Sequence, residues 1–266
     1  MNFIDNIVLR SFSLTILAIA SFACHSFALA EEIVFVNDAT PYCPYTICND
    51  GKEGYVIDVV KTIFQNRGYT VTIKNQPWNR ALATVDAGKA NGILAVTKSA
   101  APNLIYPRHE IATYIPAVFS LSDKSWNYEN VDSLKKVRLG LIQNYGNGEG
   151  NPELEKYLNS KSSKISYIAA QDGDLHLFLM IEAEHIDAMI EDQLVGNYIL
   201  DQMGKKNLFK SVRIQQNYIY GYIGFSSKDK APQKLADIFD EDIVKLRKSG
   251  QLKHILDVYG LSDWER

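Results

Sequence analysis

The sequence predicts an α/β fold of two lobes, with the second lobe inserted into the first and a two-strand hinge between them. Three observations support this prediction. Short runs of β-branched residues alternate with helical patterns, which is typical of α/β layers with mostly parallel sheets. The alternation forms two series. Two extended segments, near residues 115–121 and 218–225, bound the second series, and two such connections favour hinge closure of the lobes.

The first series begins with a predicted strand at 33–36, followed by a loop at 38–54. Apolar residues then recur at helical spacing from Tyr55 to Asn66, and Gly68 follows as a stop signal. The remaining elements predicted for this series are a strand at 70–73, a helix at 77–87 and a strand at 93–96.

The second series follows an extended run at 118–121 and a polar stretch at 122–130. Its predicted elements are strands at 137–142, 165–168 and 186–190, and helices at 152–158, 175–183 and 192–203. A strand at 218–225 then returns to the first unit, and helices at 231–248 and 252–259 complete it. We therefore expect lobe 1 to comprise 31–117 plus 222–266, and lobe 2 to comprise 118–221.

Composition indicates a folded protein that does not bind nucleic acid. Of the 266 residues, 46% are hydrophobic and 22% charged, which is ordinary for a globular chain. The net charge is -3, and the sequence has no basic stripe that would neutralise phosphates.

The N-terminus predicts export to the periplasm. Arg10 precedes an apolar run at 11–23, and Ala28-Leu29-Ala30 has the small-x-small pattern of a signal-peptide cleavage site. We expect cleavage after Ala30. A membrane anchor and a lipid anchor on Cys24 are the alternatives.

Cleavage leaves two cysteines, Cys43 and Cys48, which are five positions apart. An isolated close pair in an oxidising compartment predicts a disulfide that pins its loop locally. No histidine lies near the pair, so we expect no metal site and no cofactor. The pinned loop carries Tyr42 and Tyr45, which with Tyr55 are expected to wall a cleft, although packing explains each tyrosine almost as well.

Several ordered segments resemble one protein family. They are Gly54-Tyr55-Val56-Ile57-Asp58-Val59, Trp78-Asn79-Arg80-Ala81-Leu82, Gly88-Lys89-Ala90-Asn91-Gly92, residues 134–140, residues 186–192, residues 248–252 and Tyr259-Gly260. Together they resemble the extracellular solute-binding proteins of the polar amino-acid type, family 3. The resemblance implies the type II periplasmic binding protein fold, a small polar ligand, and a membrane permease with an ATPase as partner. We expect a monomer.

One segment departs from the family pattern. Family members that bind α-amino acids usually carry Thr-x-x-Arg after the third strand, and the arginine clamps the ligand carboxylate. Here the segment is Thr97-Lys98-Ser99-Ala100. Either another cation takes the carboxylate, for which Arg80, Lys98 and Arg108 are candidates, or the ligand has none.

The remaining site candidates each have a structural alternative. By the resemblance, Asp192 faces a ligand ammonium group, and a helix N-cap is the alternative role. Asn144 and Tyr145 follow a strand, where a ligand contact or a plain connector is expected. Trp78 is placed either to stack on a ligand or to pack between the lobes, and Thr97 either to donate a hydroxyl to the ligand or to cap a strand.

A catalytic function is the alternative to binding. The same fold also hosts cyclohexadienyl dehydratases, whose chemistry needs a proton donor with raised pKa and a cation for the substrate carboxylates. Glu149, Glu191 or Asp192 would be the acid, and Arg80 or Arg108 the clamp. The sequence has no nucleophile motif, so we expect a binding protein rather than an enzyme. A ligand-sensing partner of a membrane receptor is the third hypothesis.

Overall fold

The computed structural model describes residues 30–143, 145, 148–160, 162–169 and 172–264. The predicted signal segment and the predicted site residue Asn144 lie outside these ranges. Within them, no helix has both the length and the apolar character needed to span a bilayer.

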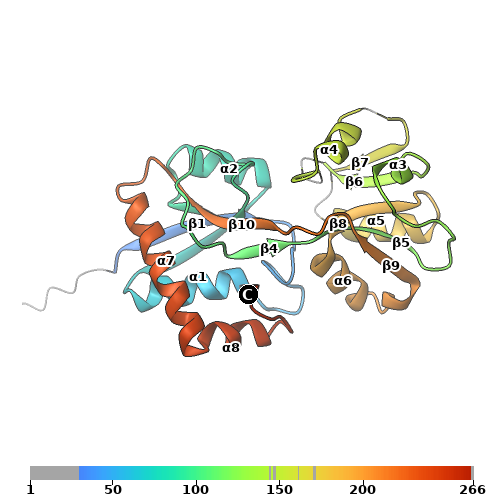
Figure 1. Cartoon of the computed structure of the whole chain (residues 1–266). Coiled ribbons are helices and arrows are strands. Elements are labelled where there is room, and N and C mark those ends of the chain that lie inside the picture. The colour runs from blue at the N-terminus through green and yellow to red at the C-terminus, as the bar shows by residue number, and fades with distance from the viewer. Residues whose placement is uncertain (1–29, 144, 146–147, 161, 170–171, 265–266) are drawn as a thin grey trace, which may run out of the picture.

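The strands form two five-stranded sheets, one in each lobe (Figure 1). The sheet of lobe 1 has the order β2-β1-β3-β10-β4, and the sheet of lobe 2 has the order β7-β6-β8-β5-β9. In lobe 1 the strands are β1 (Glu32–Asp38), β2 (Thr70–Gln76), β3 (Gly92–Val96), β4 (Ala112–Tyr114) and β10 (Ile219–Phe225). In lobe 2 they are β5 (Pro116–Leu121), β6 (Leu139–Ile142), β7 (Ile165–Ile168), β8 (Ala188–Asp192) and β9 (Phe209–Arg213). Each sheet pairs its first three strands in parallel and adds two antiparallel strands.

Helices cover both faces of each sheet. The helices of lobe 1 are α1 (Tyr55–Asn66), α2 (Trp78–Asp86), α7 (Pro232–Ser249) and α8 (Gln251–Asp257). Those of lobe 2 are α3 (Val131–Leu134), α4 (Pro152–Leu158), α5 (Gly173–Glu182), α6 (Gln193–Gln202) and the short 3-10 helix η1 (Lys206–Leu208). In lobe 1, α1, α7 and α8 lie on one face of the sheet and α2 on the other (Figure 1). The two-lobed α/β architecture predicted from the sequence is therefore confirmed.

The apolar face of α1 is buried as its helical spacing predicts. Val56, Val59, Val60 and Ile63 are 1% exposed or less and pack in the main core of lobe 1. Phe64 ends this stripe, and its ring lies 5.5 Å from the ring of Phe35 on β1. Burial of this stripe fixes α1 on the sheet, and with it the loop that precedes the helix.

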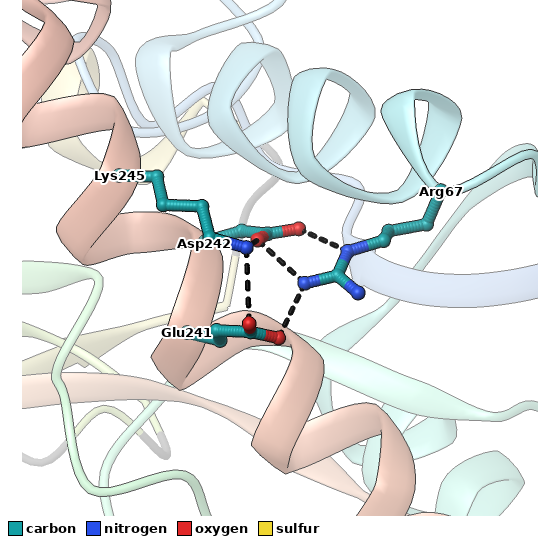
Figure 2. Close-up of polar contacts among 4 residues, drawn as sticks. All are labelled: Arg67, Glu241, Asp242 and Lys245. Carbon is teal, nitrogen blue, oxygen red and sulfur yellow. Dashed lines mark hydrogen bonds and ion pairs between the residues drawn. The ribbon is translucent and has the colours of Figure 1, made fainter.

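Ion pairs connect the C-terminal end of α1 to α7 on the outside of this core (Figure 2). Arg67, which follows α1, donates to both carboxylate oxygens of Asp242 at 2.6 and 2.7 Å and also pairs with Glu241. Lys245 contacts the same two acids at 3.0 and 2.9 Å. Hydrogen bonding to Arg67 holds the pKa of Asp242 below its usual value.

Two short segments cross between the lobes. Ile115 joins β4 to β5, and residues 214–218 join β9 to β10. These crossings run side by side, because Tyr114 pairs with Ile219 in one sheet and Ala117 pairs with Arg213 in the other (Figure 1). This arrangement is the predicted two-strand hinge.

Two strands were not expected from the sequence. The short β4 precedes the first crossing, and β9 lies at the edge of the sheet in lobe 2. The sequence of β9 contains Lys210 and Arg213, which break the apolar alternation that marks a half-buried strand. Charged residues are typical of edge strands, and this explains why the pattern was missed.

Candidate ligand-binding site

The lobes meet through loops that follow the carboxyl ends of their strands, where ligands bind in open α/β sheets. Tyr42, after β1, donates its hydroxyl to Glu191 at the end of β8 at 3.2 Å. In the other direction, Tyr145 of lobe 2 donates to Asp38 at the end of β1 at 3.2 Å. The described side-chain hydrogen bonds between the lobes therefore run largely from hydroxyls to carboxylates.

The disulfide loop brings Tyr42 to this interface. Cys43 and Cys48 form the predicted disulfide. Inside the loop, the backbone groups of Tyr42 and Thr46 exchange two hydrogen bonds of 2.9 Å each. Gly54 ends the loop with φ 97°, and a side chain there would place Cβ 2.3 Å from the Tyr45 carbonyl oxygen. The loop is therefore packed against the start of α1 with no room for a larger residue.

Tyr45 and Tyr55 belong to an aromatic cluster behind the interface. Tyr45 is fully buried, and its hydroxyl is shared between the Thr113 carbonyl at 2.7 Å and Asp192 at 3.2 Å. Its ring stacks on Tyr42 with a centroid distance of 5.5 Å. Tyr55 lies one layer deeper, in the core of lobe 1, with its ring 5.6 Å from that of Tyr45. The structure thus brings the hydroxyls of Tyr42 and Tyr45 to carboxylates of lobe 2, whereas the described ring contacts of Tyr55 lie within lobe 1.

Asp192 serves as the N-cap of α6, one of the two roles considered from the sequence. Its Oδ1 accepts the backbone N–H groups of Leu194 and Val195 at 2.9 and 3.2 Å. Its Oδ2 accepts the N–H of Ile115, in the first crossing, at 2.6 Å. With the Tyr45 hydroxyl, four donors reach this carboxylate, which has about four acceptor positions in all. Asp192 therefore ties α6, the hinge and the disulfide loop together.

Glu191 forms a buried acid pair with Asp174 in the first turn of α5. Glu191 is 5% exposed and Asp174 is 3% exposed. Burial raises the pKa of the Glu191 carboxyl well above its usual value, and the nearby Asp174 carboxyl, which hydrogen-bonds to it, raises it further. Burial also raises the pKa of Asp174, and Asp38 adds to this effect. The pair therefore retains a proton that exposed carboxylates lose.

The Thr97–Ala100 segment forms a compact turn after β3. The Thr97 hydroxyl lies 2.9 Å from that of Ser99 and accepts the Ala100 N–H at 3.3 Å. Ser99 donates to Glu149 of lobe 2 and adds another contact between the lobes. Lys98 points to the Tyr222 ring, with its ammonium 4.1 Å from the centroid, a cation–π arrangement.

The structure does not bring Arg108 to the interface. Its backbone N–H and its Nε donate to Asp240 on α7 at 3.0 and 3.1 Å, and its side chain is 85% exposed. The physical reason is the burial of Asp240, which needs several donors and also accepts the His109 N–H at 2.9 Å.

Two other candidates lie on α2. Trp78 is partly buried and packs against the lobe 1 cluster that contains Val36 and Val85. Arg80 is exposed, and its side chain makes none of the described contacts between the lobes. Their contact with a ligand stays a prediction.

Sequence reasoning missed Asp38 and Asp174 as interface groups. Asp38 ends a predicted strand and Asp174 lies in the first turn of a helix that follows another strand, so the strand-end rule was the available signal. Within the described residues, no group of three or more histidine, cysteine or acidic side chains has a metal-binding arrangement.

Comparisons with known proteins agree with this geometry. The model of the bacterial extracellular solute-binding proteins, family 3, matches residues 33–262. A histidine kinase sensor domain with similarity to periplasmic binding proteins has a TM-score of 0.69 and 18% identity, over 86% of this chain and 96% of that one. A structure from work on glutathione import via GshT and the cystine ABC importer TcyBC of Streptococcus mutans has a TM-score of 0.71 and 18% identity, over 86% and 95%.

An ABC uptake transporter substrate binding protein from Streptococcus pneumoniae with bound histidine has a TM-score of 0.68 and 18% identity, over 86% of this chain and 92% of that one. Comparison with curated protein sequences gave no match. The two-lobed periplasmic binding protein fold predicted from the sequence is confirmed by these likenesses.

Proposed function

Because this chain belongs to the bacterial extracellular solute-binding proteins of family 3, we propose that it captures a small polar ligand between its lobes in the periplasm and presents the closed form to an ABC-type permease. The observation that carries this proposal is the set of hydroxyl–carboxylate hydrogen bonds between the lobes. They come from strand-end loops on both sides, which is where a ligand held by both lobes would be contacted.

Closure acts as a population shift. In the open form the carboxylates and hydroxyls of the interface are hydrated, and in the closed form they are paired. A ligand favours the closed form only by the contacts it makes in that form and not in the open one. We propose that Tyr42, Tyr145 and Thr97 supply such contacts, with Trp78 and Arg80 at the edge of the site.

Asp192 is the natural pivot of this motion. It accepts from Ile115 in the crossing, from the N-terminus of α6 in lobe 2 and from Tyr45 in lobe 1. Opening breaks only the Tyr45 bond, because the other three donors lie within lobe 2 or the crossing itself. The carboxylate therefore keeps most of its partners through the motion.

A thermal-melt screen tests the proposal. Residues 31–266 are heated with amino acids, di-acids, amines, sugars and short peptides. A ligand at about 100 times its dissociation constant stabilises by about 2.7 kcal/mol, which raises the melting temperature by roughly 5–11 °C in a chain of this size. Tyr42→Phe should reduce the shift. The control is Tyr167→Phe, which removes a hydroxyl bonded to Leu158 within lobe 2. A flat response to the whole panel contradicts the proposal.

One observation favours a dehydratase-like enzyme as the second candidate. The pKa of Glu191 is raised by burial, as expected of a general acid at neutral pH. That chemistry also needs a cation for the substrate carboxylates. Turnover of a cyclic di-acid by the protein, and its loss in Glu191→Gln, would decide for this candidate.

The chain has a fold similar to that of a histidine kinase sensor domain. This likeness favours a second possible partner, a membrane receptor that binds the closed form in place of a permease. Co-purification of the ligand-bound protein with a permease or with a receptor distinguishes the two partners.

A further inference from the structure

The interface between the lobes is acidic. Four carboxylates accept a hydrogen bond from a hydroxyl of the opposite lobe, and the pairs are Asp38 with Tyr145, Glu149 with Ser99, Glu191 with Tyr42, and Asp192 with Tyr45. Across the part of the chain that the structure describes, no lysine, arginine or histidine side chain of one lobe bonds to the other lobe. Closure therefore gathers like charges and desolvates them with no protein cation to offset the cost.

Among the described residues, the interface between the lobes lacks positive charge. The basic residues near the Thr97–Ala100 segment do not supply it. Ala100 stands at the position where the resemblance to the family implies an arginine. Lys98 lies against the ring of Tyr222, and Arg108 is held by Asp240. The structure thus shows the carboxylates of a cation site. Of the candidate clamps, Lys98 and Arg108 are engaged elsewhere, and the exposed Arg80 on α2 makes none of the described contacts between the lobes.

The Asp192 carboxylate already accepts four hydrogen bonds. Further hydrogen bonds from a ligand would therefore have to go to the neighbouring carboxyls of Glu191 and Asp174. Glu191 accepts from Tyr42 at 3.2 Å and from the Asp192 N–H at 2.7 Å, and it faces Asp174. Asp174 is the exceptional group. Beyond the hydrogen bond between the Asp174 and Glu191 carboxyls, Asp174 has a buried Oδ1 to which no N–H or hydroxyl group of the described residues donates. A buried carboxylate oxygen without a donor is costly, and a ligand N–H would satisfy it.

A space between the lobes adjoins Asp174, the member of the pair that lines it. A cavity of about 200 Å³ is walled by Thr40 and Pro41 from lobe 1 and by Asp172 and Asp174 from the start of α5. The rest of its wall comes largely from α6, including the ring of Tyr198. Pockets for drug-sized ligands span about 300–1,000 Å³, so this cavity suits a compact molecule. Because both lobes wall it, its occupant would favour closure.

We propose, on the basis of the solute-binding function above, that the ligand is a small organic cation with N–H donors and no carboxylate, an amine or a guanidine, whose charged end is held by Asp174 and Glu191. Charge-assisted hydrogen bonds to the two carboxylates supply the missing positive charge and a partner for Asp174 Oδ1. The cavity between the disulfide loop, α5 and α6 receives the remainder of the molecule.

Binding is coupled to a proton. The charged and titratable groups that face the pair are Asp38, Asp192, Tyr42 and Tyr145, and none of them is a cation. Because burial raises the pKa of both carboxyls, and the neighbouring Asp174 raises the pKa of Glu191 further, the free pair holds a proton that the ligand cation displaces into solvent. Binding therefore releases about one proton, and affinity increases with pH by up to about tenfold per unit while the pair titrates.

The experiment compares cations that differ only in a carboxylate. Isothermal titration of residues 31–266 is carried out with agmatine and arginine, cadaverine and lysine, and putrescine and ornithine. We expect at least one decarboxylated compound to bind about 30-fold or more tightly than its amino acid. Repeating that titration in two buffers of different ionisation enthalpy should show the released proton.

Two isosteric variants test the site. Glu191→Gln and Asp174→Asn remove charge but keep volume, and each should weaken binding of the same cation by at least about 30-fold. The matched control is Asp187→Asn, which precedes β8 in the same lobe and pairs with Arg138 away from the interface. It should leave affinity unchanged. Melting temperatures of all three variants report whether they fold.

The outcomes separate the two proposals. Tighter binding of the amino acids, or of an anion or a sugar from the wider panel, overturns the cation inference and leaves the binding function standing. Unchanged cation affinity in folded Glu191→Gln and Asp174→Asn overturns the site. The absence of any ligand across both panels rejects the binding function and this inference with it.

Discussion

The Cys43–Cys48 disulfide should stabilise the protein without shaping its binding loop. Replacing both cysteines with serine (Cys43→Ser with Cys48→Ser) removes a covalent link between residues with a sequence separation of five. In the chain-entropy model a closed loop of this size lowers the free energy of the folded state relative to the unfolded state by about 2 kcal/mol at 25 °C. The folded loop keeps its backbone hydrogen bonds, including Ile47 to Glu53 at 2.7 Å and Cys48 to Lys52 at 3.0 Å.

Urea unfolding at 25 °C, followed by tryptophan fluorescence, measures the loss of stability in the double variant. The wild-type protein treated with reductant should lose the same amount, and titration with an identified ligand should give an affinity within a few-fold of the wild type. An unchanged free energy of unfolding combined with a large loss of affinity would refute the reasoning, because the disulfide would then act on the position of Tyr42 in the folded state.

The remaining predictions concern lobe 1. Gly54→Ala should cost about 3 kcal/mol, because the new Cβ meets the Tyr45 carbonyl at φ 97°. Gly51→Ala, at φ 86° with open space around it, should cost only about 1 kcal/mol, and equal losses in urea unfolding would contradict this difference. Arg67→Met should cost about 1–2 kcal/mol at pH 7, because it removes two charge-assisted bonds to the mostly buried Asp242 (Figure 2). Since Arg67 holds the pKa of Asp242 below its usual value, this stabilisation is present above about pH 4 and is lost as the pH falls through the folded-state pKa. The wild type and Arg67→Met should therefore converge in acid. Lys253→Met, which breaks an exposed pair with Asp257, is the control and should change stability little at either pH.

Elements whose residues carry their own periodicity were predictable from the sequence. The stripe from Val56 to Phe64 identified α1, and the isolated pair of cysteines identified the disulfide. The edge strand β9 was missed because exposure of one edge admits Lys210 and Arg213, which remove the alternation.

The site was less predictable because its groups are assembled over long separations in sequence. Arg108 was a candidate cation, but its direction is set by Asp240, which lies 132 positions away. The importance of Asp174 arises from burial beside Glu191, and burial of a polar side chain has no local signature. Asp192 carried a local signature for both of its roles, and the structure shows the capping role.

The strand order of lobe 1 has a consequence for the sequence in which the protein folds. β10 lies between β3 and β4, yet it is made last of the five strands, after the whole of lobe 2. During synthesis from the N-terminus, β3 and β4 have no common neighbour until residues 219–225 emerge. Lobe 2 is continuous from β5 to β9 and is the first unit able to complete its sheet.

Lobe 1 therefore has the higher contact order and should fold more slowly. A chain that ends before β10 would contain every strand of the lobe 2 sheet but would lack the strand that joins β3 to β4 in lobe 1. Completion of the lobe 1 sheet therefore waits until nearly all of the polypeptide has been made.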